Sequence, residues 1–185
     1  MLILASTSPR RRELLRNAGI TFRVVPTGLS EIPLAGETPR ACVERLAREK
    51  ALAVSHAHPG EWVLGADTIV VVDGEILGKP VDEADAARML RLLSGRTHEV
   101  TTGVCLAAKA IEDVRSETTL VTMIALGEDD IRDYIASGEP MDKAGAYAIQ
   151  GRASRWIPRV EGDYANVVGL PVALVYRMLR EHHAL

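Results

Sequence analysis

The stretch from Val63 to Pro80, VLGADTIVVVDGEILGKP, decides the fold that this sequence predicts. Its β-branched run, Ile69–Val72, is too short to cross a membrane and is typical of a buried central strand. Asp73-Gly74 then predicts a tight hairpin turn, and Pro80 ends the segment because proline cannot donate to a strand ladder. We therefore expect a strand, a two-residue turn and a short returning strand.

Asp67 interrupts this apolar segment, and Lys79 lies near its end. Burying a bare carboxylate costs several kcal/mol, so Asp67 must be solvated, paired or bound to a cation. One interpretation is that Asp67 and Lys79 face each other across the hairpin. In the alternative, Asp67 and Thr68 bond their own backbone at a bulge, and Lys79 is a solvated turn residue.

Length and composition are those of an ordinary globular protein with one core. The 185 residues suffice for one well-buried α/β domain, or for two small lobes that share a cleft. A net charge of −3 provides no bulk attraction to nucleic acid or to a membrane, so we expect neither as a partner. No stretch reaches transmembrane length and the amino terminus lacks the order of a signal peptide, which predicts a cytoplasmic protein.

The two cysteines, Cys42 and Cys105, lie far apart in the sequence. They form neither a CxxC metal pair nor a disulfide framework, so we expect two buried free thiols.

The amino terminus predicts a strand, a loop and a helix. Leu2–Ala5 is apolar, Ser8 is a good N-cap, Pro9 suits the first helical position and Gly19 suits the end of the helix. The loop brings hydroxyls, backbone N–H groups and the positive end of the helix dipole to one place.

Three arginines, Arg10, Arg11 and Arg12, follow this loop. Arginines at a helix amino terminus are disfavoured by the dipole unless an anion compensates, which favours a phosphate site. The alternative is a basic helix start that is only solvated.

The rest of the chain alternates strands and helices. Expected strands are Phe22–Val25, His98–Ala107, Thr118–Leu126 as the antiparallel partner of the preceding one, and Trp156–Val160; expected helices are 38–56, 83–93, 128–137 and 171–183, with a turn region at Asn166–Pro171. By default Arg48–Lys50 is a solvated charged face, His98 makes a hydrogen bond and binds no metal, and His182-His183 is a frayed terminus.

The segment Gly138–Trp156, GEPMDKAGAYAIQGRASRW, places Glu139, Asp142 and Lys143 among small residues. Small residues let a backbone approach a ligand closely, and Gln150 offers a donor and an acceptor for a base edge. A plain glycine-rich connection is the alternative.

Several blocks taken together resemble one family. They are LASTSPRRRELL, GADTIVVVDGEILGKP, LSGRTHEVTTGV, and EPMDKAGAYAIQG with NVVGLP. In this order and spacing they closely resemble the Maf family of nucleoside triphosphate pyrophosphatases. The resemblance implies a single domain over 1–185 with an elongated mixed sheet, two lobes and a cleft, similar to the inosine triphosphate pyrophosphatases.

The resemblance also implies a reaction. Family members hydrolyse a nucleoside triphosphate between the α and β phosphates to the monophosphate and pyrophosphate, with Mg²⁺ or Mn²⁺, and a homodimer is usual. Asp67 is then the proton acceptor that activates water, and Asp67 with Glu31 holds the metal. The implied phosphate-binding residues are Ser6, Arg11, Lys50, Lys79 and Lys143.

Substrate choice in the family follows three positions, which are Arg10, Thr68 and Gln150 here. This combination resembles the branch that acts on dTTP and UTP, and modified pyrimidine nucleotides are a further possible substrate class. Ala148 departs from the glycine that is commoner in this branch. Two alternatives remain, a 7-methyl-GTP pyrophosphatase and a nucleotide-sensing regulator of cell division.

Overall fold

The structure, a computed structural model, describes residues 1–29 and 31–185. Its strands form a seven-stranded mixed sheet in the order β2-β1-β3-β5-β6-β7, with β4 paired to β3. β1 is parallel to β2 and β3, whereas β3–β4 and β6–β7 are antiparallel. The expected α/β class with a mixed sheet is therefore confirmed.

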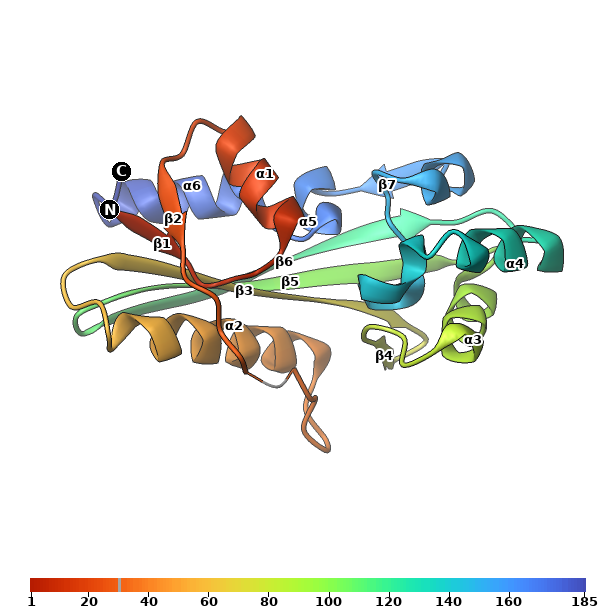
Figure 1. The fold of residues 1–185 in the computed structure, drawn as a ribbon, viewed down its shortest axis with the longest axis horizontal. Coiled ribbons are helices and arrows are strands. Elements are labelled where there is room, and N and C mark those ends of the chain that lie inside the picture. Colours follow the sequence, from red (N-terminus) through yellow and green to blue (C-terminus); the bar gives the residue numbers. More distant parts are fainter. Residues whose placement is uncertain (30) are drawn as a thin grey trace. The chain divides into compact units, whose positions relative to one another are not determined.

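The elements follow one another along the chain (Figure 1). The strands are β1 (Leu2–Leu4), β2 (Phe22–Val24), β3 (Trp62–Val72), β4 (Glu75–Leu77), β5 (Thr97–Ala108), β6 (Ile111–Thr122) and β7 (Arg159–Glu161). The α-helices are α1 (Pro9–Asn17), α2 (Pro39–Ser55), α3 (Glu83–Leu93), α4 (Glu128–Ala136), α5 (Tyr164–Val168) and α6 (Val172–Glu181). The 3₁₀ helices within the described residues are η1 (Glu139–Asp142), η2 (Ala144–Ala146) and η3 (Arg152–Trp156).

The chain divides into two compact units. The first consists of Met1–Thr68, Thr102–Glu117 and Gly169–Leu185, and the second of Ile69–Thr101 and Thr118–Val168. The long strands β3, β5 and β6 contribute residues to both units. That the chain forms one domain over 1–185 stays a prediction.

In the first unit, helices cover both faces of the strands. α2 lies on one face and α1 and α6 lie on the other (Figure 1). Successive side chains of a strand point to opposite faces, so each strand supplies both cores. Leu4 and Leu64 pack with residues of α1 and α6, whereas Ile3 and Val63 pack with residues of α2.

Two glycines bring α2 close to the sheet. A β carbon on Gly65 of β3 would lie 2.2 Å from the Ala47 carbonyl oxygen, and one on Gly103 of β5 would lie 2.3 Å from the Val43 carbonyl oxygen. No side chain fits at such distances, so the helix backbone rests directly on these strands. The residue at position 50, three after Ala47, is thereby brought near β3.

The local start and turn signals are confirmed. The Ser8 side chain accepts a hydrogen bond from the Arg11 N–H at the start of α1, and Thr38 accepts one from Ala41 at the start of α2. In the central hairpin Val72 pairs with Glu75, which leaves Asp73-Gly74 as the turn. Their φ angles of 49° and 80° suit the two-residue turns that match strand twist.

The β5–β6 hairpin is confirmed, but its second strand was placed wrongly. Hydroxyl pairs join Thr97 to Thr122 at 2.9 Å and Thr101 to Thr118 at 3.0 Å, so the partners run antiparallel. β6 begins at Ile111 and ends at Thr122, not at 118–126. Residues 112–117 are polar except for Val114 and largely half-buried, so they lack the apolar alternation by which the first half of the strand could have been predicted.

Three further expectations near the carboxyl terminus are wrong. The expected strand at 156–160 is shifted to β7 at Arg159–Glu161, and the short helix α5, Tyr164–Val168, overlaps the first part of the expected turn at 166–171. The Asn166 side chain donates to the Val100 carbonyl and to Thr119, which fixes this helix by contacts distant in sequence. His182 is not frayed, since its Nε2 lies 2.9 Å from the Asp113 carboxylate.

In the second unit, a buried histidine and tyrosine form a pair. His98 Nε2 lies 2.8 Å from the Tyr147 hydroxyl, which confirms the expected hydrogen bond. Among the described residues the other ring nitrogen, Nδ1, has no hydrogen-bond partner. Burial lowers the pKa of His98 to about 4, because the charged ring would lose its hydration.

Both thiols are free and buried, as expected. Burial raises the pKa of Cys42 to about 11 and that of Cys105 to about 12. Among residues 1–29 and 31–185 no helix is long and apolar enough to cross a membrane.

We expect Gly65→Ala to lower the free energy of unfolding by about 1–3 kcal/mol, because its methyl group would overlap the α2 backbone. Urea unfolding measures this. Gly28→Ala is the matched control, since a β carbon there meets nothing within 4 Å. Equal stability of the two variants would contradict the close approach of α2.

His98 makes stability depend on pH with a definite sign. Its folded pKa, about 4, lies below the ordinary value of 6.5, so the unfolded chain binds the proton first. The contribution of the neutral His98 ring to the free energy of unfolding is complete above pH 6.5. It falls by about 3 kcal/mol in total as the pH falls towards 4. We expect His98→Gln to remove this part of the acid sensitivity in urea unfolding at several pH values; parallel pH curves for both proteins would refute the assignment.

Candidate active site

The polar residues at positions 67 and 68 of β3 point to opposite faces of the sheet. Asp67 shares its face with Val63 and Gly65, against which α2 packs. Thr68 shares its face with Leu64 and therefore points towards α1 and the start of α6. The middle of one strand thus supplies residues to two separate polar clusters, both within the first unit.

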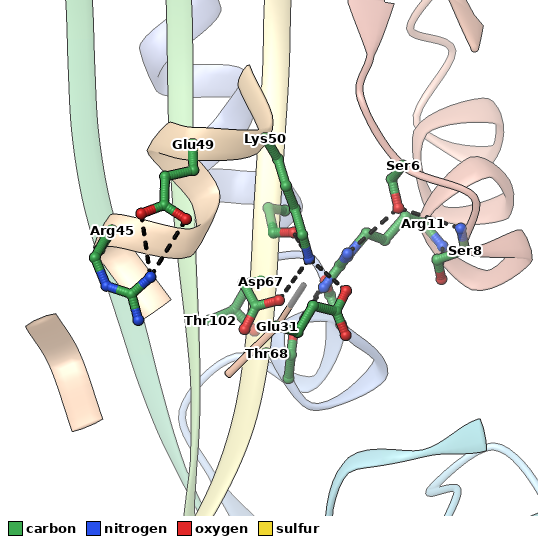
Figure 2. A network of polar contacts seen from close by, with 12 residues as sticks. Ser6, Ser8, Arg11, Glu31, Arg45, Glu49, Lys50, Asp67, Thr68 and Thr102 are labelled. Atoms are coloured by element: carbon green, nitrogen blue, oxygen red, sulfur yellow. Dashed lines mark hydrogen bonds and ion pairs between the residues drawn. The ribbon is translucent and has the colours of Figure 1, made fainter. Parts of the chain in front are cut away.

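The first cluster is an ammonium held by two carboxylates. Lys50 Nζ donates to Asp67 Oδ1 and to Glu31 Oε1, each at 2.6 Å (Figure 2). The Lys50 and Asp67 side chains are only 5% and 7% exposed, whereas that of Glu31 is 38% exposed. The default expectation of a solvated face is therefore wrong for Lys50, which α2 turns towards β3.

Arg45 ties the loop that carries Glu31 to α2. Its guanidinium binds both oxygens of Glu37, at 2.7 and 2.8 Å, and also the Ile32 carbonyl at 3.1 Å and Glu49 at 3.1 Å. The Arg45 hydrogen bond lowers the pKa of Glu37 to about 2. These Arg45 contacts were not predicted from the sequence, although the spacing of four residues between Arg45 and Glu49 on a helix is a signal for an ion pair.

The second cluster surrounds Arg11, which α1 turns inward. Its Nε donates to the Gly169 carbonyl at 2.8 Å, Nη1 to Ser6 Oγ at 3.3 Å and Nη2 to Thr68 Oγ1 at 3.0 Å (Figure 2). Thr68 Oγ1 also lies 2.9 Å from Thr102 Oγ1. Burial lowers the pKa of Arg11, yet a guanidinium stays charged at any physiological pH.

The three arginines at the start of α1 therefore lie in different environments. Arg11 is buried and contacts neutral oxygens, Arg10 is half-buried, and Arg12 donates to the Thr7 carbonyl at 3.1 Å. Positive charge and the amino-terminal N–H groups of α1 lie together, as expected. That they bind an anion stays a prediction.

The other candidate residues belong to the second unit, which contains Lys79, Lys143 and Gln150. Lys143 Nζ donates to the Glu139 carbonyl and to Asp142 Oδ1, each at 2.6 Å. Lys79 and Gln150 are exposed. That Asp67 faces Lys79 stays a prediction, while the ion pair that the structure gives to Asp67 is with Lys50.

The oxygen atoms of Asp67 and Glu31 fit a hard divalent cation. Both carboxylates already converge on one positive charge, that of Lys50. No group of three or more His, Cys, Asp or Glu residues within the described part of the chain could hold a metal ion. Mg²⁺ needs no such cage, because it is usually bound by one or two carboxylates together with substrate phosphates and water.

Comparisons with known proteins agree with these motifs. A family model described as "Maf-like protein" matches residues 1–182. A "dTTP/UTP pyrophosphatase" of Koribacter versatilis (strain Ellin345) is 61% identical over 179 residues, covering 97% of this chain and 93% of the relative. A protein of the same name from Symbiobacterium thermophilum is 54% identical, covering 97% of this chain and 93% of the relative.

A solved structure has a similar fold. The Staphylococcus aureus Ham1 protein matches with a TM-score of 0.57 and 14% identity, over 98% of each chain. At this identity the likeness concerns the fold alone, and it agrees with the expected fold class.

Removing Lys50 should leave a buried carboxylate without its ammonium. We expect Lys50→Met to lower the free energy of unfolding by about 3–5 kcal/mol, and Lys50→Met combined with Asp67→Asn to recover most of that loss, as measured in urea. Arg48→Met on the same helix is the control, because its ion pair with Glu112 is exposed. A double variant as unstable as Lys50→Met would refute the buried pair as the cause.

Proposed function

Because this chain belongs to the Maf family, we propose that it hydrolyses dTTP and UTP to the monophosphate and pyrophosphate. One observation carries the proposal: relatives that share 61% and 54% of their residues with nearly the whole chain are named dTTP/UTP pyrophosphatases. Modified pyrimidine nucleotides are a further proposed substrate class. A single domain over 1–185, a homodimer and a cytoplasmic location belong to the same proposal.

Asp67 is the proposed general base. Its carboxylate accepts the proton of the water that attacks the α phosphorus, and pyrophosphate leaves. The hydrogen bond from Lys50 to Oδ1 fixes the orientation of the carboxylate. The buried pair thus holds the Asp67 carboxylate in a fixed orientation before substrate arrives.

Asp67 and Glu31 would also hold a divalent metal ion, Mg²⁺ or Mn²⁺. When bound, such an ion stabilises charge on the phosphates and lowers the pKa of a bound water. The Lys50 ammonium, which lies between the two carboxylates, would then donate to substrate phosphate oxygens. Arg45 supports this site because it holds the Glu31 loop on α2.

The remaining polar and basic groups would bind the triphosphate, and three positions would select the base. Ser6, Arg11, Lys79 and Lys143 are the proposed phosphate ligands besides Lys50. The structure supports a fixed guanidinium at Arg11, since three of its nitrogens are already oriented. Arg10, Thr68 and Gln150 are the proposed specificity positions, with Thr68 acting through its hydrogen bond to Arg11.

We expect purified protein with Mg²⁺ or Mn²⁺ to release pyrophosphate and the monophosphate from dTTP and UTP in preference to CTP, GTP and 7-methyl-GTP. Asp67→Asn should lower kcat by about 10²–10⁴-fold with an unchanged circular dichroism spectrum. Asp73→Asn, in the exposed hairpin turn, is the matched control with normal turnover.

Three outcomes would contradict this proposal in different ways. Preferred turnover of 7-methyl-GTP would reassign the substrate. Nucleotide binding without any turnover would favour a sensor over an enzyme. Normal turnover by Asp67→Asn would remove Asp67 from the chemistry and leave the reaction itself intact.

A further inference from the structure

In the second unit, one glutamate holds two segments together. Glu139, the first residue of η1, has a carboxylate that accepts from the Tyr134 hydroxyl at 2.8 Å and from the Arg152 backbone N–H at 3.0 Å. Neither Tyr134 nor Glu139 has a role in the proposed reaction. Their contacts nevertheless surround the residue proposed to read the base.

The segment from Ala148 to Arg152, with the exposed Gln150 at its centre, is tied at both ends. The Tyr134 hydroxyl accepts from the Ala148 N–H at 3.0 Å and donates to Glu139. The other end is bound by Glu139 directly, through Arg152 N–H. The Gly151 N–H donates to the Ala148 carbonyl at 3.0 Å, which closes the turn around Gln150.

Close packing makes this arrangement specific. A β carbon on Gly151 would lie 2.1 Å from the Glu139 carboxylate, so the Gly151 backbone lies directly against that carboxylate. Tyr134 is fully buried, and its ring meets Trp156 edge-on at 5.1 Å between centroids. Burial raises the pKa of Tyr134, so the hydroxyl stays protonated and can donate to Glu139.

The same glutamate contacts the proposed phosphate ligand. The Glu139 main-chain carbonyl accepts from Lys143 Nζ at 2.6 Å, while the Glu139 carboxylate holds the Gln150 segment. Glu139 thus contacts both Lys143, which is proposed to bind a phosphate, and the segment that carries Gln150, which is proposed to bind the base. A fixed distance between them is what positioning of a nucleotide requires.

We infer that Glu139 and Tyr134 are positioning residues for pyrimidine selection: they hold the amide of Gln150 at a fixed place relative to Lys143. The inference rests on the proposed function, because Gln150 reads a base only if the substrate is a nucleotide. Substitution of either side chain leaves the carbonyl that binds Lys143 in place. These substitutions should therefore reduce the preference among bases more than they reduce kcat.

The test compares kcat and KM for dTTP, UTP and CTP in wild type, Tyr134→Phe, Glu139→Ala, Gln150→Ala and Glu139→Ala/Gln150→Ala. We expect Tyr134→Phe and Glu139→Ala to reduce the preference for dTTP over CTP in kcat/KM by about 10–10²-fold, mainly through KM. In the Gln150→Ala background Glu139→Ala should change this preference no further, since coupled residues are not additive. Tyr164→Phe, at a half-exposed tyrosine, is the control with unchanged preference.

Amide hydrogen exchange supplies a readout that needs no activity. Tyr134→Phe should speed exchange at the Ala148 N–H, and Glu139→Ala should speed exchange at the Arg152 N–H, with both proteins folded by circular dichroism. Faster exchange together with lost preference supports the inference. Unchanged amide exchange at both N–H groups would overturn it. So would an equal loss of kcat for every nucleotide, whether Glu139→Ala is made in the wild-type protein or in Gln150→Ala.

Failure of the proposed function would look different. Wild-type protein that hydrolyses neither dTTP nor UTP would overturn the proposed reaction and with it the selection role, whatever the exchange rates. Should Glu139→Ala not fold, Tyr134→Phe alone decides, because it removes one hydroxyl and keeps the ring against Trp156.

Discussion

The buried ion pair between Lys50 and Asp67 is the constraint on which the first unit depends. A carboxylate and an ammonium that are both almost fully buried must stay together, because separating them would leave a charge without compensation. Such a pair adds little net stability but dictates where its two elements lie. It therefore fixes α2 against the middle of β3 at the position where the chemistry is proposed, and Glu31 adds a second carboxylate that a cation can use.

The backbone makes this pair possible. Gly65 and Gly103 remove the side chains that would keep α2 at the usual distance, and the alternation of β3 then turns Asp67 towards α2 and Thr68 towards α1. In the second unit, hydrogen bonds to Glu139 play the corresponding part for residues 148–152. In both units a polar side chain or segment is held by contacts that leave it little freedom, so binding a substrate would cost less conformational entropy there.

Local signals in the sequence predicted much of the fold. Ser8 with Pro9, Thr38 with Pro39, and Asp73-Gly74 act through their own backbone geometry, so the helix starts and the hairpin turn appear where expected. Strand β6, helix α5 and the place of His182 were predicted wrongly. Each of them depends on partners far away in the chain, such as Val100 and Thr119 for Asn166, and no local pattern reports such partners.

By itself the sequence determined the α/β class, the central hairpin, the helix caps, the family and the identity of the candidate residues, because motifs and turn chemistry are properties of neighbouring residues. Only the tertiary structure decided which of those residues meet. Residue spacing alone did not separate Lys50 from a solvated helix lysine, and only the packing of α2 on Gly65 shows its contact with Asp67. The supporting contacts of Arg45, Tyr134 and Glu139 were likewise not predicted from the sequence. Burial and long-range hydrogen bonds exist only after the chain has folded, and they fix the place and orientation of each polar side chain.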